Sequence, residues 1–192
     1  MTRLTRASPP KGPRLGRCRT QPLPTPMQTV TSVPQTSDVL RVLANLIEYA
    51  RDGQEGFRQA AEHAKAPELV EFFQECSQQR AGFVDELQGL ERLLGQASPD
   101  DSGSMTGALH RAWIDIRTVV TKRDDQAILE EAERGEDAAV AAYRGALESE
   151  STPLPSNISN VIRAQAAIVK NTHDQVRDLR DSGRYQTANA GA

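Results

Sequence analysis

Apolar residues recur every three or four positions along residues 36–65, the spacing that gathers them on one face of an α-helix. The run Thr36, Ser37, Asp38 offers side chains that can cap the first turn of this helix. We therefore predict a helix from this run to about Lys65. Its apolar face would consist of Leu40, Leu43, Leu46, Ile47, Ala50, Phe57, Ala61 and Ala64.

A second helix is predicted to begin at Pro67, because proline fits the first turn of a helix. Gly95 and the polar segment SPDDSGS at residues 98–104 mark the end of this second helix. The spacing of apolar residues again indicates one buried face. That face comprises Leu69, Phe72, Phe73, Cys76, Phe83, Leu87 and Leu90.

Three further amphipathic segments complete the pattern. A shorter helix is predicted from about Met105, another from Asp124 or Asp125 to about Glu150, and the last from Asn157 to about Ser182. The segment STPLPS separates the last two helices. No segment alternates apolar and polar residues with the period of two that a half-buried strand shows, so we predict an all-α domain.

An internal repeat indicates how these helices are connected. A shift of 82 positions aligns residues 46–55 with residues 128–137, and each copy precedes a break and another amphipathic helix. This pattern predicts two helical hairpins that form a ferritin-like four-helix bundle, with an extra helix in the long crossover between the second and third bundle helices. The alternative is an up-and-down bundle with a fifth helix attached. The aligned pairs include Gly53 with Gly135 and Gln54 with Glu136.

A polar layer is predicted halfway along the bundle, because both repeats place a glycine followed by Gln54 or Glu136 on the apolar face of the helix. A buried amide without a partner costs about 1 to 3 kcal/mol. With a rise of about 1.5 Å per residue, counting from each hairpin turn places Gln79 level with Gln54. The same count places Thr172 or His173 level with Glu136. We expect these side chains to satisfy one another and to fix the register of the helices.

A metal centre is the alternative interpretation of the same layer. Ferritin-like di-iron bundles carry a glutamate on each of two helices and Glu-x-x-His on each of the other two. Here one carboxylate and one imidazole would not supply the hard oxygen ligands that two ferrous ions require. We therefore favour a structural layer and expect no cofactor. The metal alternative is an iron or manganese ion held by Gln54, Glu75, Gln79, Glu136 and His173.

Both ends of the chain differ from the helical region. The first 36 residues contain six basic residues, seven prolines and no acid, so we predict a disordered basic tail, and a second tail over residues 183–192. Met27 is an alternative start site. Because the formal net charge of the chain is −3, residues 37–192 carry −9, which disfavours binding of nucleic acid. No apolar run is long enough for a membrane span or a secretory signal, so we expect a cytoplasmic protein that does not bind membranes.

Five stretches occur in the order in which a known family carries them: LIEYARDGQEGFRQAAE, FFQECSQQRAGF, SGSMTGALHRAWIDI, AILEEAERGEDAAVAAYRGAL and THDQVRDLR. They resemble a bacterial family of ferritin-like four-helix-bundle proteins catalogued as a domain of unknown function, over about residues 37–182. The resemblance implies a ferritin-like bundle with a crossover helix, and very little about activity. The family's Gly-Glu-Glu-Gly-Phe motif has glutamate where this chain has Gln54, which lowers the metal interpretation further.

Two hypotheses for function follow. The favoured one is a non-enzymatic, cytoplasmic helical bundle that acts as a stress-associated or partner-binding protein, because a strong fold signal accompanies an incomplete catalytic set. The alternative is a metal-handling protein with a reduced ferroxidase-type site. Self-association into a homo-oligomer is compatible with both hypotheses.

Overall fold

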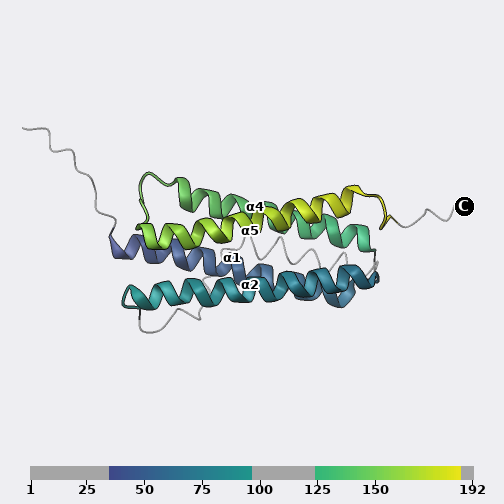
Figure 1. The fold of residues 1–192 in the computed structure, drawn as a ribbon, viewed down its shortest axis with the longest axis horizontal. Helices are drawn as coiled ribbons and strands as arrows, with labels where there is room; N and C mark the ends of the chain where they lie inside the picture. The colour runs from purple at the N-terminus through teal and green to yellow at the C-terminus, as the bar shows by residue number, and fades with distance from the viewer. Residues whose placement is uncertain (1–34, 97–123, 187–192) are drawn as a thin grey trace, which may run out of the picture. The chain divides into compact units, whose positions relative to one another are not determined.

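The computed structural model describes residues 35–96 and 124–186. Within these ranges the chain forms four helices and no strand, which confirms the all-α prediction. They are α1 (Thr36–His63), α2 (Pro67–Leu93), α4 (Asp125–Glu148) and α5 (Ser156–Asp181), as Figure 1 shows. The helix expected from Met105 and most of the two predicted tails lie outside the described residues.

The ends of the helices follow from local sequence. Pro67 occupies the first turn of α2, and the preceding Ala66 has the extended backbone that a residue before proline favours. The side chain of Asp124 accepts a hydrogen bond from the backbone nitrogen of Gln126 and so caps α4, as predicted. Gly95 follows α2 with φ of 92°, a left-handed conformation that glycine adopts at little cost. By contrast, the first turn of α1 has no side-chain cap.

The directions of the helices are fixed by contacts between them. Both oxygens of Asp125, in the first turn of α4, accept hydrogen bonds from backbone nitrogens of Lys65 and Ala66, at 2.8 and 3.0 Å, in the turn between α1 and α2. Residues near the start of α2 contact the end of the α5 region, since the Tyr185 hydroxyl lies 3.3 Å from Glu68. Thus α2 and α4 run in one direction and α1 and α5 in the other. The last residue of α2 and the first residue of α4 lie at opposite ends of the bundle.

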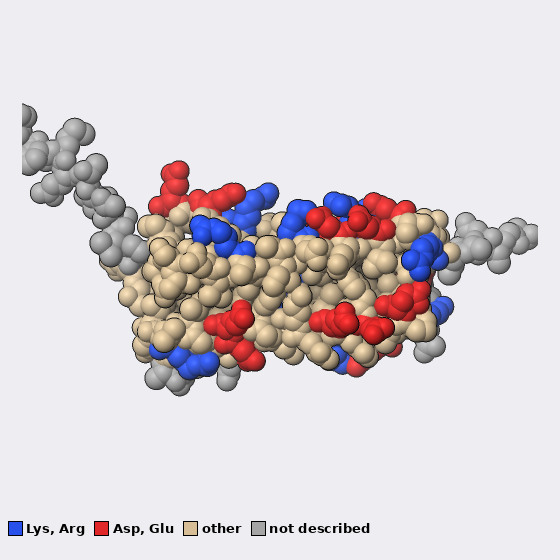
Figure 2. All heavy atoms as spheres, viewed as in Figure 1, with Lys and Arg blue, Asp and Glu red and all other residues tan. Residues whose placement is uncertain are grey.

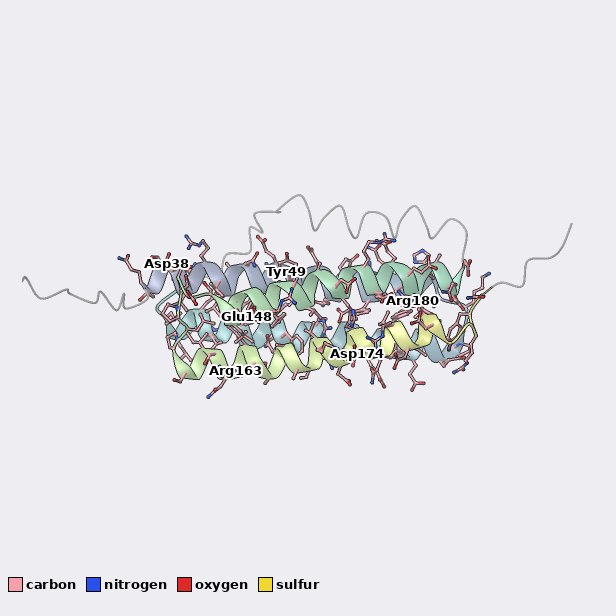
Figure 3. The ribbon with its side chains drawn as sticks, turned by 90° about the horizontal axis from the view of Figure 1, so that it is seen from above. Asp38, Tyr49, Glu148, Arg163, Asp174 and Arg180 are labelled. Carbon is pink, nitrogen blue, oxygen red and sulfur yellow. The ribbon has the colours of Figure 1, made fainter. Side chains whose placement is uncertain are left out.

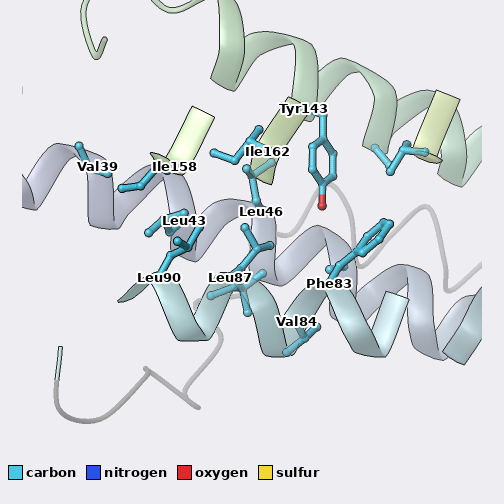
Figure 4. Packing of buried hydrophobic residues seen from close by; sticks show 14 residues of the cluster. Val39, Leu43, Leu46, Phe83, Val84, Leu87, Leu90, Tyr143, Ile158 and Ile162 are labelled. Carbon is cyan, nitrogen blue, oxygen red and sulfur yellow. The ribbon is translucent and has the colours of Figure 1, made fainter. Parts of the chain in front are cut away.

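The core consists of apolar side chains from all four helices. Figure 4 shows Leu43 and Leu46 of α1 converging with Leu87 of α2, Ile162 of α5 and Tyr143 of α4. Each fully buried leucine or isoleucine stabilises the fold by about 1.5 to 3 kcal/mol relative to an exposed one. At the start of α1 the buried residue is Val39, whereas Leu40, predicted to face the core, is only half-buried.

A second apolar cluster lies toward the turn between α1 and α2. Phe57 and Phe73 are fully buried, with ring centroids 6.0 Å apart, and they pack in one cluster with Leu129 of α4 and Val176 of α5. Tyr185, which follows α5 and belongs to the segment expected to form a tail, is buried in the same cluster. The two clusters leave a polar region between them, where the candidate site lies.

Candidate functional site

An ion pair occupies the interior of the bundle between α2 and α4. The guanidinium Nη2 of Arg80 donates a hydrogen bond to Oε2 of Glu136 at 2.6 Å, and the two side chains are only 2% and 1% exposed. A charge taken out of water is expensive, so a buried pair is stable only when its members remain together. Removing one partner from such a pair costs about 3 to 5 kcal/mol.

The side chain of Arg80 is held on several sides. Its guanidinium carbon lies 5.6 Å from the centre of the Phe57 ring and 5.1 Å from that of the Phe83 ring, close enough for cation–π attraction. Its Nη1 donates a hydrogen bond to the Gln79 amide oxygen at 2.8 Å. On the side of α1 lies Gly53, where an added β-carbon would stand 3.4 Å from Cγ and Cδ of Arg80. The missing side chain at Gly53 therefore leaves the space that Arg80 fills.

Burial and charge act in opposite directions on Glu136. Burial raises the pKa of its carboxyl above the usual 4.5, whereas the neighbouring guanidinium of Arg80 lowers it, and burial is the larger effect. His173 lowers the same pKa to a smaller degree. The net result is a pKa above the usual value, although the Arg80 guanidinium lies beside the carboxyl.

Hydrogen bonds extend this polar region to α5. The amide oxygen of Gln79 also lies 3.4 Å from the Thr172 hydroxyl, which donates more closely to the backbone oxygen of Ile168 at 3.1 Å. Thr172 is 3% exposed, so its hydroxyl is satisfied inside the protein. The chain of contacts thus runs from Glu136 on α4 through α2 to α5.

The predicted site residues are only partly brought together. Gln79, Glu136 and Thr172 join the polar region through Arg80. Gln54 is half-buried, and the contact recorded across the α1–α2 hairpin uses its backbone oxygen, which accepts from the Ser77 hydroxyl at 2.9 Å. Glu75 is exposed.

His173 faces the outer edge of the α4–α5 hairpin. Its Nε2 lies 2.9 Å from Asp137, and its Nδ1 lies 3.2 Å from Asp174. Hydrogen bonds from Lys170 and His173 hold the pKa of Asp174 below its usual value. These contacts place the imidazole between two surface carboxylates and beside the buried pair.

Arg80 and Gln165 are the two buried polar residues that the sequence prediction missed, although the spacing of buried positions points to both. The buried positions of α2 include Phe73, Cys76, Arg80 and Phe83, at spacings of three and four, so Arg80 lies directly in the apolar series. Of the predicted pair in α1, Gly53 is buried and Gln54 is half-buried. In α5 the same spacing selects Gln165, which is 1% exposed.

Gln165 organises a second buried polar contact, one level away from Arg80. Its amide oxygen accepts a hydrogen bond from the Tyr143 hydroxyl at 2.8 Å, and its amide nitrogen donates to Glu86 at 2.7 Å. Burial raises the pKa of the Tyr143 phenol, so this hydroxyl remains a donor. The contact ties α4 to α5 and α5 to α2.

Acidic residues of α4 are also more buried than a solvated face would be. Glu131 and Glu133 are 2% and 9% exposed. Glu133 forms an ion pair with Arg180, which lies at the seam between α4 and α5 in Figure 3. Glu131 pairs with Arg134 of its own helix.

The central residues do not fit a ferritin-type metal centre. Among residues 35–96 and 124–186, no group of three or more histidine, cysteine, aspartate or glutamate side chains is arranged to hold a metal ion. The one carboxylate of the central layer already has the Arg80 guanidinium as its cation, and Glu75 points outward. Burial raises the pKa of the Cys76 thiol to about 12, so it stays protonated and is a poor ligand and nucleophile at neutral pH.

In the part of the chain that the structure describes, none of the helices is both long enough and apolar enough to cross a bilayer.

Comparison with known proteins identifies a protein family that this chain matches. The family model of a domain of unknown function (DUF2383) matches residues 38–149, from the first turn of α1 to the residue after α4. The match includes Gly53, Arg80 and Glu136, whereas α5 lies beyond it. A search of curated proteins finds no match. Because the family model covers more than half of the 192 residues, this chain belongs to the family of the domain of unknown function DUF2383.

Proposed function

We propose that this protein is a non-enzymatic, ferritin-like four-helix bundle that acts by binding a partner protein. The observation that carries the proposal is the buried ion pair between Arg80 and Glu136, 2.6 Å apart in the layer where a ferritin-like bundle would bind metal. A cation supplied by the protein itself takes the role that a metal ion would have. The layer then stabilises the arrangement of the helices and leaves the surface for function.

The chemistry of the central side chains supports a structural role. A catalytic acid or base must reach its substrate within hydrogen-bond distance. The carboxyl of Glu136 is 1% exposed and Arg80 covers one of its oxygens. The Cys76 thiol, which lies nearby, is held protonated by burial.

The helix directions support the ferritin-like part of the proposal. Because α2 and α4 run in the same direction, the chain must pass from one end of the bundle to the other between them, as in folds with one long crossover. An up-and-down bundle would instead alternate direction from each helix to the next. We further propose a bacterial, cytoplasmic protein, in line with the bacterial family that its sequence resembles. The acidic charge of −9 over residues 37–192 opposes binding to nucleic acid.

The competing proposal is a metal-binding protein that uses Gln54, Glu75, Gln79, Glu136 and His173 for iron or manganese. Metal analysis after loading separates the two proposals. Protein purified without chelator is incubated with ferrous iron or manganese, desalted and measured for metal per chain, as wild type and as Glu136→Gln. We expect substoichiometric metal that is the same in both proteins. One metal ion per chain in the wild type, lost in the variant, would overturn the structural assignment.

A further inference from the structure

A groove lies between α2 and α5. Its volume is about 640 Å³, within the range of sites that hold a ligand or a few side chains of a partner. It extends along α2 from Phe72 to Gln79 and along α5 from Asn171 to Ser182. At about 1.5 Å per residue, the α2 wall is about 10 Å long, the span of three extended residues.

The floor of the groove combines apolar and amide groups. Phe72 and Leu179 are partly buried and pack against the second apolar cluster, so their accessible sides form an apolar end of the groove. Toward the middle lie the buried Cys76 and Thr172. The Gln79 oxygen is already occupied by Arg80 and Thr172, so the floor is connected directly to the central ion pair.

The two walls of the groove carry carboxylates on opposite helices. Glu75 of α2 and Asp178 of α5 both line it, and both are exposed. Asp178 accepts a hydrogen bond from its chain neighbour Arg177 at 3.2 Å, and Glu75 makes no ion pair within the described ranges. In the right half of Figure 2, acidic side chains lie below an uncharged band, and acidic and basic side chains lie together above it. A positively charged side chain between the two walls would be attracted to both.

One basic residue also lines the groove but does not neutralise these walls. Arg184, at the end beyond α5, lies 3.5 Å from Glu68 and above the ring of Tyr185. The charge of Arg184 is therefore paired with Glu68 and not with Glu75 or Asp178. The charged side chains that line the groove are Glu75, Asp178 and Arg184, and their formal charges sum to −1. Arg177 partly offsets Asp178, so Glu75 is the stronger attraction for a cation.

We propose that this groove is the docking site for a short basic segment of the partner protein. A lysine or arginine of that segment lies between Glu75 and Asp178, and an adjacent apolar side chain packs on Phe72 and Leu179. This inference rests on the proposed partner-binding function and adds the chemical class of the partner. Charge steers the association and selects against acidic segments, while the apolar contact supplies affinity.

The test measures peptide binding to the full chain by NMR titration at low salt. The probes are acetyl-Leu-Lys-Leu-amide and its counterparts with glutamine or glutamate in place of lysine. We expect the lysine peptide to shift backbone amide signals of Gln79, Thr172 and Leu179, the glutamine peptide to bind more weakly, and the glutamate peptide not to bind. Such selectivity is the consequence of the two carboxylates on the walls.

A matched pair of variants separates local from general charge. Glu75→Gln/Asp178→Asn removes both wall charges, whereas Glu62→Gln/Asp85→Asn removes two exposed acids that do not line the groove. An exposed ion pair contributes up to about 1 kcal/mol, so the first variant should weaken lysine-peptide binding by about five- to tenfold. The second variant should weaken it by less than about twofold. Circular dichroism checks that both remain helical.

The outcomes also distinguish a failure of the groove assignment from a failure of the proposed function. Equal weakening in both variants, equal binding of the three peptides, or no binding of the lysine peptide overturns the groove as a basic-segment site. Peptide-induced shifts of amide signals on another face also overturn the groove as the binding site. That result would still be compatible with partner binding as the function. Stoichiometric metal in the separate loading experiment overturns the proposed function, whichever peptide binds.

Discussion

Gly53 of α1 and Arg80 of α2 are complementary: a β-carbon at position 53 would stand 3.4 Å from two carbons of the arginine side chain. The glycine costs α1 about 1 kcal/mol of helix stability relative to alanine. In return, the arginine lies in the interior with its charge against Glu136. A side chain longer than that of alanine at position 53 would therefore compete with Arg80 for the same space.

Substitutions at Gly53 should therefore depend on size. Gly53→Ala makes only an ordinary van der Waals contact and regains helix propensity, so we expect a change between zero and about 1 kcal/mol in favour of folding. Gly53→Leu must displace Arg80 and should destabilise by about 1 to 3 kcal/mol or more. Gly145→Leu is the control, because a β-carbon there meets no atom within 4 Å. Urea unfolding measures all three, and equal effects of leucine at positions 53 and 145 would contradict the role of Gly53.

The buried ion pair predicts strong coupling between its two members. Arg80→Met leaves Glu136 buried without its cation and should cost about 3 to 5 kcal/mol of unfolding free energy. The double variant Arg80→Met/Glu136→Met removes both charges and should recover to within about 1 kcal/mol of the wild type.

A double-mutant cycle by urea denaturation measures this coupling, and Glu136→Met alone completes it. The exposed pair Arg41 with Asp38, 3.1 Å apart, provides a comparison for which less than about 1 kcal/mol is expected. Additive effects of the two central substitutions would show that the charges do not depend on one another.

The raised pKa of Glu136 predicts a particular pH dependence. Between the usual value of 4.5 and the higher folded value, the folded protein retains a proton that the unfolded chain has released. Folding stability contributed by this group is therefore present at low pH and decreases as pH rises through that window. Glu136→Gln cannot titrate, so the wild type should lose stability relative to this variant as pH rises from 4.5.

The measurement is the unfolding free energy of both proteins from pH 4.5 to 8. The difference between them should change only within the window and become constant above the folded pKa of Glu136. A wild type that gains stability relative to Glu136→Gln with rising pH would mean that Arg80 lowers that pKa more than burial raises it.

The sequence predicted the helices well, because their signals are local. The spacing of apolar residues, Pro67, Asp124 and the segment STPLPS placed all four helix starts within about a turn. The centre was harder to predict. Counting residues from the turns identified Gln79, Glu136 and Thr172. Hydropathy treats an arginine as a surface residue, so it gives no indication that Arg80 is buried, although Arg80 lies in the apolar series of α2. A charged side chain becomes a core residue only through its partner on another helix, and that pairing is not visible in one segment.

The Tyr143–Gln165 contact provides a test of the neighbouring polar level. Tyr143→Phe keeps the ring in the core but removes the hydroxyl that donates to the Gln165 amide oxygen. Because Gln165 is 1% exposed, water does not replace this donor, and we expect a loss of about 1 to 3 kcal/mol. Tyr49→Phe is the control, since Tyr49 is only half-buried and should change stability by less than about 0.5 kcal/mol.

Thermal and urea unfolding compare these two variants with Tyr143→Phe/Gln165→Leu, which removes both members of the hydrogen bond. Replacing both partners by apolar groups leaves no orphaned acceptor on Gln165, and Glu86, which then loses its own donor, is exposed and can bond to water. The double variant should therefore be no less stable than Tyr143→Phe alone. A double variant that is less stable by the sum of two independent losses would show that Gln165 is held by Glu86 and not by Tyr143.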